Sequence, residues 1–361
     1  MQKILIIHDR FQYKGGGERL VLIMAQALQA DILTEYWDEQ NSFSKAEAPS
    51  QVFIMGKQFK IKGLGYVSAQ LRFFFKTKMI NNYDVIIFSG NNCLSAAWRV
   101  PAKRKIMYCH TPVRYAYDLK NFYYQKCPFY LKPIFLLFVY MARILYKWGI
   151  KKMNVVVANS KNVQSRLQKY CGIKSTVIYP PINTKKFHWL GQANYYLSFA
   201  RLVDLKRVDD IVLAFQKMID KQLIIASGGP EIGKIKQLAK NYSNIKILGF
   251  VDDNTLAQLA GNCVANIYIP RQEDFGMTPM EAAAAGKPTI GVNDGGLRET
   301  IIHKETGYLI SQNYKIKDII KAVEWLDNDK ALDMKDACLA QAAKFDKSIF
   351  ISRLQKIIKN Y

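Results

Sequence analysis

Short runs of apolar residues alternate with segments of helical periodicity along most of the chain. Residues 3–9 (KILIIHD) have the pattern of a short buried strand, and Glu18–Leu28 carries apolar residues at helical spacing. The same criteria predict further strands in the first half, at Asp84–Ser89, Lys105–Cys109, Val155–Ala158 and Thr176–Tyr179. Leu131–Lys152 is predicted to form one long helix.

The second half repeats this alternation. Strands are predicted at residues 195–202, 222–228, 245–250, 265–270 and 287–292. Helices are predicted at Asp209–Met218, Glu231–Asn241, Thr255–Asn262, from Pro279 onward, at Ile316–Leu326, at Ala331–Ala343 and at Ser348–Asn360. Because strands that alternate with helices form parallel sheets covered on both faces, the pattern predicts an α/β protein with two Rossmann-like, doubly wound domains.

The segment 180–194 (PPINTKKFHWLGQAN) separates the two blocks, because consecutive prolines continue neither a strand nor a helix. The length of 361 residues suits two domains of average size. We therefore predict an N-terminal domain over residues 1–185 and a C-terminal domain over residues 186–345. Ligands of such sheets bind beyond the carboxyl ends of the strands, so we expect the site in a cleft between two facing domains.

Composition excludes several classes of protein. Half of the residues are hydrophobic and 22% are charged, which excludes a disordered chain. The six cysteines form no CxxC pair, and no histidine lies at metal-ligand spacing from them, so we expect free thiols and no metal site. The N-terminal apolar run is too short for a signal peptide. The longest apolar stretch, Ile134–Ala142, is shorter than the roughly 20 residues of a membrane span, and these features predict a cytoplasmic protein without a transmembrane helix.

Positive charge is concentrated in the first half. The net charge is +23, and residues 1–190 hold 29 basic and 9 acidic side chains, whereas no acidic residue occurs between Leu119 and Val203. Aromatic residues alternate with the basic ones in Leu119–Lys152. A second such segment places basic residues around Phe73–Phe75, namely Lys57, Lys60, Lys62, Arg72, Lys76 and Lys78. Surfaces of this kind bind an anionic membrane or single-stranded nucleic acid, unless the aromatic residues are core and the charges form a solvated face.

The strongest motif is Glu273–Glu281 (EDFGMTPME), directly after a predicted strand. One interpretation is a helix start, in which Thr278 is the N-cap, Pro279 the first helical residue and Glu281 the reciprocal capping residue. The other is a binding site, in which the backbone N–H groups of residues 274–277 and the helix dipole hold a diphosphate. Glu281 would then face a ribose and Glu273 the hydroxyl groups of a sugar.

Three further features carry candidate chemistry with a plain structural alternative. Arg201 and Lys206 follow a predicted strand, where two solvated cations are the ordinary interpretation. The loop Gly15–Gly17 does not match the dinucleotide-binding fingerprint. His110 follows the strand at Lys105–Cys109, a place where a lone histidine is usually structural.

The segment that begins at Glu273 resembles a known family. The segment EDFGMTPMEAAAAGKPTIGVNDGGLRETI is similar to the donor-binding signature of the family-4 retaining glycosyltransferases, which have the GT-B fold. Six more blocks agree in the family's order, namely KGGGERL, YCHTPVRYAYD, ANSKNVQSRL, VIYPPINTKKF, SFARLVDLKRVDDIVLAF and ASGGPE. The last block departs from the family pattern, since Ser227 stands where a glycine is usual. The resemblance spans about residues 3–310.

The resemblance implies roles for the matching residues. His110 and Glu273 are expected to be catalytic, at the donor sugar. The expected donor-binding residues are Gly16, Gly17, Arg201, Lys206, Asp274, Phe275, Gly276, Met277 and Glu281. The expected acceptor-side residues are Arg114, Tyr115 and Asp118. Gly295 and Gly296 match a loop near the donor, or simply form a tight turn.

The implied activity is transfer of a hexose from a nucleotide sugar, with GDP-mannose as the favoured donor, with retention and without a metal ion or cofactor. The implied acceptor is a glycan, often linked to polyisoprenyl diphosphate, as in bacterial O-antigen or exopolysaccharide synthesis. We expect the N-terminal domain to bind the anionic inner face of the plasma membrane, with no nucleic-acid partner. By analogy, the C-terminal helix, residues 346–361, should pack back on the N-terminal domain.

Two alternatives remain open at this stage. A GT-B epimerase acting on UDP-GlcNAc lacks support, because the pattern that spaces Glu273 and Glu281 belongs to the transferases. A basic nucleic-acid-binding protein without catalysis is favoured only by the charge and the aromatic residues.

Overall fold

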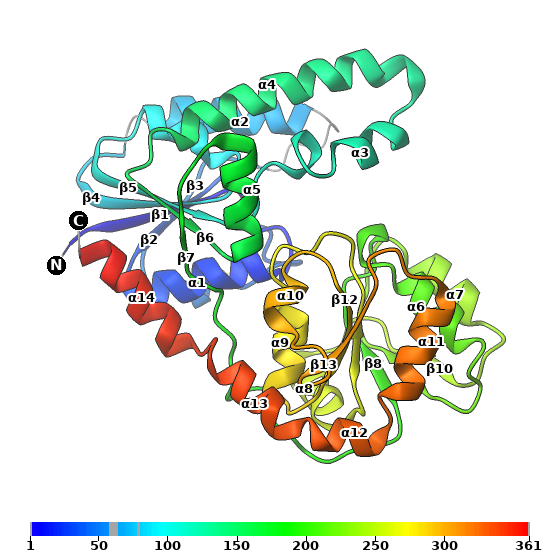
Figure 1. The fold of residues 1–361 in the computed structure, drawn as a ribbon. Coiled ribbons are helices and arrows are strands. Elements are labelled where there is room, and N and C mark those ends of the chain that lie inside the picture. The colour runs from blue at the N-terminus through cyan, green and yellow to red at the C-terminus, as the bar shows by residue number, and fades with distance from the viewer. Residues whose placement is uncertain (1, 58–63, 78–79, 360–361) are drawn as a thin grey trace. The chain divides into compact units, whose positions relative to one another are not determined.

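A computed structural model describes residues 2–57, 64–77 and 80–359 (Figure 1). The basic residues Lys60, Lys62 and Lys78 lie outside this described part. The chain divides into two compact units, the first formed by Met1–Tyr179 with Ile351–Tyr361 and the second by Pro180–Phe350.

The described part of the first unit is built on a seven-stranded parallel sheet of order β3-β2-β1-β4-β5-β6-β7. The strands are β1 (Ile4–His8), β2 (Asp31–Thr34), β3 (Val52–Ile54), β4 (Tyr83–Ser89), β5 (Ala102–Cys109), β6 (Val155–Ala158) and β7 (Thr176–Val177). Ile6 of the inner strand β1 pairs with Ile32 on one side and Ile87 on the other. Because the strand order reverses beside β1, the carboxyl ends of β1 and β4 mark the place where ligands of such sheets bind.

Helices cover both faces of this sheet (Figure 1). They are α1 (Gly16–Leu28), α2 (Leu64–Lys76), α3 (Lys120–Lys126), α4 (Lys132–Ile150) and α5 (Lys161–Cys171), with short 3₁₀ turns η1 (Lys45–Glu47), η3 (Cys93–Trp98), η4 (Arg114–Ala116) and η5 (Phe129–Leu131). The last turns of α14 (Lys347–Lys359) also belong here, since the buried Arg104 guanidinium donates to the Ile358 carbonyl at 2.7 Å.

The second unit has, in its described residues, a six-stranded parallel sheet of order β10-β9-β8-β11-β12-β13. The strands are β8 (Tyr196–Ser198), β9 (Leu223–Ile225), β10 (Ile245–Ile247), β11 (Asn266–Tyr268), β12 (Thr289–Val292) and β13 (Gly307–Ile310). The helical elements are η6 (Asp204–Lys206), α6 (Val208–Phe215), α7 (Ile232–Ala239), α8 (Asp253–Asn262), α9 (Met277–Ala284), α10 (Leu297–Thr300), α11 (Ile316–Trp325), α12 (Asn328–Asp333) and α13 (Lys335–Ala343).

Two parallel sheets with alternating helices confirm the predicted fold class. The sequence pattern missed three strands. Strand β3 is a three-residue edge strand with exposed side chains, and β2 is a four-residue strand that carries polar residues at both ends. The third, β13, begins with a glycine and is only partly buried. Such short strands lack the apolar runs on which the prediction relied.

The exclusion of a membrane-spanning helix was too strong. Among the described residues, Phe129–Ile150 is long and apolar enough to cross a membrane by length and composition, and most of its residues are not buried. The sequence criterion was a continuous apolar run, and Lys132 and Arg143 interrupt it. A helix of membrane-spanning length tolerates a few charged residues, so an interrupted apolar run does not exclude one.

Candidate functional site

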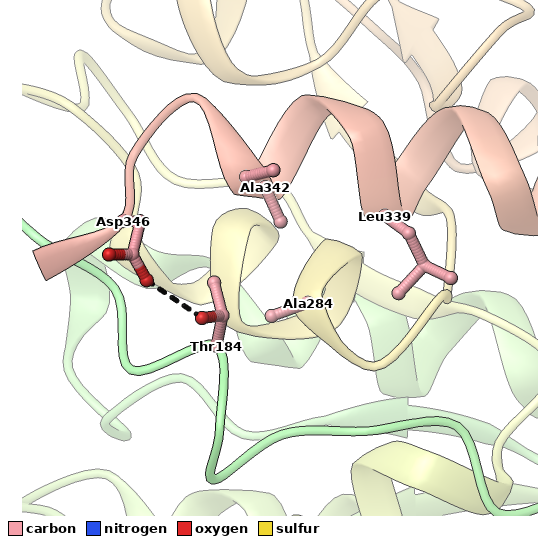
Figure 2. Close-up of a pocket in the computed structure, with 6 residues that line it drawn as sticks. Thr184, Ala284, Leu339, Ala342 and Asp346 are labelled. Carbon is pink, nitrogen blue, oxygen red and sulfur yellow. Dashed lines mark hydrogen bonds between the residues drawn. The ribbon is translucent and has the colours of Figure 1, made fainter. Parts of the chain in front are cut away.

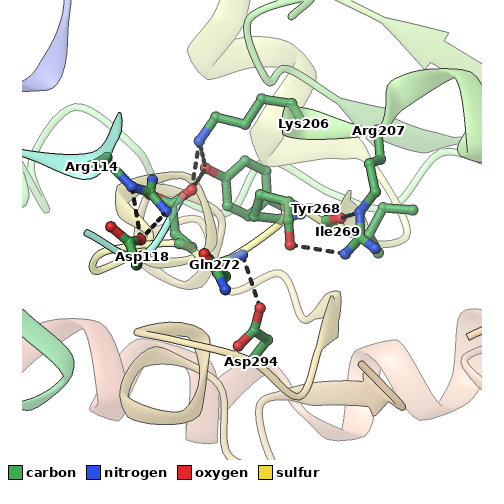
Figure 3. Close-up of polar contacts among 10 residues, drawn as sticks. Arg114, Asp118, Lys206, Arg207, Tyr268, Ile269, Gln272 and Asp294 are labelled. Atoms are coloured by element: carbon green, nitrogen blue, oxygen red, sulfur yellow. Dashed lines mark hydrogen bonds and ion pairs between the residues drawn. The ribbon is translucent and has the colours of Figure 1, made fainter. Parts of the chain in front are cut away.

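The second unit gathers three polar side chains at the carboxyl end of its sheet (Figure 3). Lys206 Nζ lies 2.5 Å from Glu273 Oε2 and 2.5 Å from the hydroxyl of Tyr268, and that hydroxyl donates to the same carboxylate oxygen at 2.7 Å. Lys206 ends η6 after β8, Tyr268 is the last residue of β11, and Glu273 lies in the loop that follows it. We call Lys206, Tyr268 and Glu273 the lysine cluster.

The lysine cluster is charged and only partly open to solvent. The side chains of Lys206 and Glu273 are 24% and 16% exposed, and Tyr268 is buried. Burial, together with the neighbouring Glu273 carboxylate, raises the pKa of Tyr268 well above its usual value. The phenol therefore stays protonated and donates to Glu273, and the ammonium group is held by two oxygen acceptors.

Hydrogen bonds from neighbouring loops fix the segment that carries Glu273. The Arg207 guanidinium donates to the carbonyls of Ile269 and Pro270 at 2.8 and 2.9 Å. The backbone N–H of Gln272, a residue in the left-handed region, donates to the Asp294 carboxylate at 2.8 Å (Figure 3). This strand-to-helix loop is thus held from β8 on one side and from β12 on the other, which keeps Glu273 in place.

Positions 295 and 296 require glycine, because the backbone of the loop that carries Glu273 passes too close to them for a side chain. A Cβ on Gly295 would lie 2.2 Å from the Glu273 carbonyl oxygen, and one on Gly296 would lie 2.4 Å from that of Asp274. The Gly296 N–H donates to the Glu273 carbonyl at 2.9 Å. The sequence had left open whether this pair is only a tight turn, and the structure shows that it packs against the candidate donor loop.

The interpretation of Thr278 and Glu281 as a capping box is wrong. Helix α9 begins at Met277, and its N-cap is Gly276 in the left-handed region with no side-chain cap. Thr278 and Glu281 therefore lie inside the helix, and the first-turn N–H groups belong to the segment that follows Glu273. These groups have no acceptors within the helix, so they are suited to an anion.

The remaining donor-binding predictions fall on the loops around the lysine cluster. Arg201 follows β8 and is exposed, on the same loop as Lys206. Asp274, Met277 and Glu281 are partly exposed. Phe275 is buried, with its ring 5.5 Å from that of Phe345, so its side chain belongs to the core and only its backbone could meet a ligand.

In the first unit, His110 lies at the carboxyl end of β5 in a small polar network. Its Nε2 is 2.8 Å from the Ser89 hydroxyl, and His8 Nδ1 contacts the Ser89 carbonyl. Burial lowers the pKa of His110 to about 3, and His8 adds to the effect. The imidazole is therefore neutral near pH 7. A Cβ on Gly17 would lie 3.9 Å from His110 Cε1, which places the glycine-rich start of α1 beside this histidine.

The three acceptor-side candidates lie in and after η4. The Asp118 side chain is 5% exposed and accepts from the Arg114 guanidinium at 3.0 and 3.2 Å (Figure 3). The Arg166 guanidinium of α5 lies 3.3 Å from the same Asp118 oxygen. Tyr115 stacks on Phe138 of α4 at 5.3 Å, and burial raises its pKa. The Asp118 carboxylate therefore links η4 to α5, since it pairs with Arg114 of η4 and with Arg166 of α5.

Two other features of the described residues bear on function. Among them, no group of three or more His, Cys, Asp or Glu side chains could hold a metal ion. A pocket lined by α9, α13 and the segment before β8 contains the hydrogen bond from Thr184 to Asp346 at 2.9 Å, and its other lining residues are Ala284, Leu339, Ala342 and Ala343 (Figure 2). This lining carries no cation and is separate from the lysine cluster.

Comparison with known proteins identifies both units. Residues 14–186 match the family model described as "Glycosyltransferase Family 4", and residues 181–345 match "Glycosyl transferases group 1". The alpha-1,3/1,6-mannosyltransferase ALG2 of Dictyostelium discoideum is 24% identical over 96% of this chain and 95% of its own length. A GDP-mannose-dependent alpha-(1-6)-phosphatidylinositol monomannoside mannosyltransferase of Mycobacterium tuberculosis is 27% identical over 50% of this chain and 55% of its own.

Solved structures agree on the fold. Anabaena HepE in complex with UDP superposes with a TM-score of 0.75 at 18% identity over all of both chains. A sucrose-phosphate synthase from Thermosynechococcus elongatus gives a TM-score of 0.81 at 17% identity, over 100% of this chain and 99% of its own. With both family models matched in order and the fold shared along the whole chain, this protein belongs to the family-4 glycosyltransferases and has the GT-B fold.

Proposed function

We propose that the chain transfers mannose from GDP-mannose to a lipid-linked glycan acceptor in cell-surface polysaccharide synthesis, such as that of O-antigen or exopolysaccharide. The donor is favoured by the relatives, because the full-length and the partial match described above are both mannosyltransferases. Transfer proceeds in this proposal with retention of configuration and without a metal ion or cofactor. The acceptor is linked to polyisoprenyl diphosphate or another lipid, at the cytoplasmic face of the plasma membrane.

The lysine cluster is the observation that carries this proposal. A leaving nucleoside diphosphate gains negative charge in the transition state, and a fixed ammonium group stabilises that charge. Lys206 supplies such a cation, and α9 begins just after Glu273 with N–H groups suited to phosphate oxygens. Arg201 on the same loop adds a second positive charge.

In this proposal Glu273 accepts hydrogen bonds from the hydroxyl groups of the sugar, and Glu281 from the ribose. When the diphosphate binds to Lys206, the ammonium group interacts less with Glu273. The Glu273 carboxylate then accepts hydrogen bonds from the hydroxyl groups of the sugar instead. In the first unit, the neutral His110 and the glycine-rich loop with Gly16 and Gly17 are assigned to the donor sugar and its phosphate. Arg114, Tyr115 and Asp118 are assigned to shaping the acceptor side.

A donor screen tests the assignment. GDP-mannose, UDP-glucose, UDP-galactose and UDP-GlcNAc are added separately, and thermal unfolding is followed. A ligand at 100 times its Kd stabilises the folded state by about 2.7 kcal/mol. GDP-mannose should give the largest shift, and labelled mannose should then appear on a lipid-linked acceptor, unaffected by a metal chelator. A larger shift with a uridine donor would contradict the mannose assignment, and no shift with any donor would contradict nucleotide-sugar binding.

The stereochemical part of the proposal has its own readout. The anomeric configuration of the transferred sugar, read by NMR of the product, should match that of the donor. An inverted product would contradict retention while leaving the donor assignment standing.

A further inference from the structure

Helix α4 is apolar on two opposite faces. Its inner face packs into the core of the first unit through buried residues that include Val139, Ala142 and Tyr146. A helix at the surface of a soluble protein normally presents polar residues on the other side. In α4 the outer face is apolar as well, since Ile134 and Leu137 are 63% and 64% exposed.

The outer residues form a continuous stripe. The exposed side chains of Ile134, Leu137, Met141 and Trp148 recur at intervals of three, four and seven residues, which places them on one side of the helix. Phe129 and Tyr130 in η5, at the N-terminal end of α4, are also exposed and extend the stripe.

Helix α2 carries a similar stripe beside it. Val67, Leu71 and Phe75 are exposed at four-residue spacing. The Tyr66 ring of α2 lies 5.1 Å from the Phe138 ring of α4, so the two helices are neighbours, as Figure 1 also shows. Exposed apolar stripes on two neighbouring helices exceed the isolated apolar residues normal for a protein surface, and they mark an interaction site.

Basic side chains surround this surface. Lys126 lies over the Phe122 ring at 4.5 Å, and Lys132 over Tyr124 at 4.9 Å, near the N-terminal end of α4. At the other end, Lys152 lies 4.1 Å from the Trp98 ring, which itself lies 6.5 Å from the ring of Trp148. Apolar residues bordered by aromatic rings and lysines have the arrangement of a surface that contacts lipid, with cations at the headgroup level.

The charge distribution selects among possible occupants. No acidic residue occurs between Leu119 and Val203, so a second copy of this surface would bring like charges together. The exposed aromatic rings at either end of the α4 stripe could stack on nucleic-acid bases, but the aliphatic side chains of Ile134, Leu137 and Met141 between them could not. An anionic bilayer satisfies both the positive charge and the apolar area.

We propose that the outer face of α4, with η5 and the exposed stripe of α2, is an interfacial membrane anchor for anionic bilayers. This inference rests on the part of the proposed function that places the acceptor at a membrane, and it does not depend on the identity of the donor. The helix lies in the plane of the interface and does not span the bilayer, because its inner face is held by the unit. The Arg143 guanidinium donates to the Ala116 carbonyl at 2.7 Å, and Tyr146 contacts Cys109 in the core.

The test compares two matched double variants. Ile134→Gln with Leu137→Gln alters the proposed anchor, and Ile219→Gln with Leu332→Gln removes two similarly exposed apolar residues from the second unit. Sedimentation with vesicles of about three parts phosphatidylcholine to one part phosphatidylglycerol should show at least about tenfold weaker binding for the first variant only. Thermal unfolding and donor binding of both variants should match wild type, which separates this surface from the donor site.

Salt and quenching measurements decide the mode of attachment. Insertion predicts that wild type stays bound at about 1 M salt, where purely electrostatic attachment is screened. It also predicts that lipids brominated along the acyl chain quench Trp148, measured as the fluorescence lost relative to a Trp148→Phe variant. Release by salt with no effect of the anchor variant would overturn insertion but leave electrostatic attachment standing. Absence of vesicle binding would overturn both modes of attachment. If the protein instead dimerises without lipid and the anchor variant is monomeric, the surface is an interface with a second copy and the membrane proposal is overturned.

Discussion

Replacing Lys206 by alanine removes the cation that the proposed mechanism needs most. In the structure this ammonium lies 2.5 Å from both Glu273 Oε2 and the Tyr268 hydroxyl, with 24% of its side chain exposed. Hydrogen bonds to charged groups contribute about 1.5–3 kcal/mol to stability. Because water can reach the Glu273 carboxylate left behind, we expect a cost near the lower value. At about 2–4 °C for each kcal/mol, Tm should fall by a few degrees.

The catalytic effect should be larger than the structural one. Loss of one preorganised donor to a developing charge typically costs about 2.7–4 kcal/mol, or a factor of about 10²–10³ in turnover. We therefore expect the Lys206→Ala variant to remain folded at assay temperature while kcat/KM for the nucleotide sugar falls by that factor. Binding of the nucleoside diphosphate product should weaken in parallel, because in this account the same cation holds its phosphates.

A second ion pair in the same unit provides the control. Lys234 Nζ lies 2.5 Å from Asp209 Oδ2, the same separation, but the two side chains are 54% and 30% exposed. Exposed pairs contribute about 0–1 kcal/mol, so Lys234→Ala should change neither Tm nor kcat/KM appreciably. The assay is initial-rate transfer at several donor concentrations, with Tm measured on the same preparations. Wild-type kcat/KM from the Lys206→Ala variant, or an equal loss from the control, would refute the assignment.

Three further substitutions give separable outcomes. Gly17→Ala should leave Tm unchanged or slightly raised, because the added Cβ meets its nearest neighbour at 3.9 Å. Turnover should nevertheless fall, because the proposal places this segment against the donor. Wild-type turnover would count against that contact. Gly296→Ala should lower both Tm and turnover, since its Cβ would lie 2.4 Å from the Asp274 carbonyl oxygen, and a variant of normal stability would show that the loops separate freely. His110 has a folded-state pKa of about 3, below its unfolded value, so the unfolded chain binds the extra proton and stability is lost as pH falls from about 6.5 toward 3. His110→Gln should flatten this acid limb in pH-dependent denaturant unfolding by about one proton, and an unchanged slope would contradict the neutral state of His110 in the folded chain.

The sequence predicted the lysine cluster only in part, for a physical reason. Lys206 and Glu273 are charged residues in loops after strands, and a matching family pattern singled them out. Tyr268 was missed because it ends the apolar strand β11, where a tyrosine reads as core. Its position as the last residue before the Glu273 loop is the available signal, because side chains at the carboxyl end of a strand face the ligand edge of the sheet.

Two other differences show tertiary context overriding local preference. The spacing of Thr278 and Glu281 fits a capping box, but the helix begins earlier, at Met277, because Gly276 adopts a left-handed conformation packed against Leu297 of α10. Likewise, the sequence of α4 left open whether its aromatic residues are core or surface, and the fold buries one face of the helix and leaves the other exposed. Neither outcome can be read from periodicity, because each depends on which elements pack nearby.

The central claim is that the second unit binds the donor diphosphate with Lys206 and the start of α9. A structure of the full chain with a bound nucleoside diphosphate tests it most directly. The account predicts phosphate oxygens within about 3.2 Å of Lys206 Nζ and of N–H groups in the first turn of α9. A diphosphate seated elsewhere, with Lys206 still paired only with Glu273 and Tyr268, would contradict it.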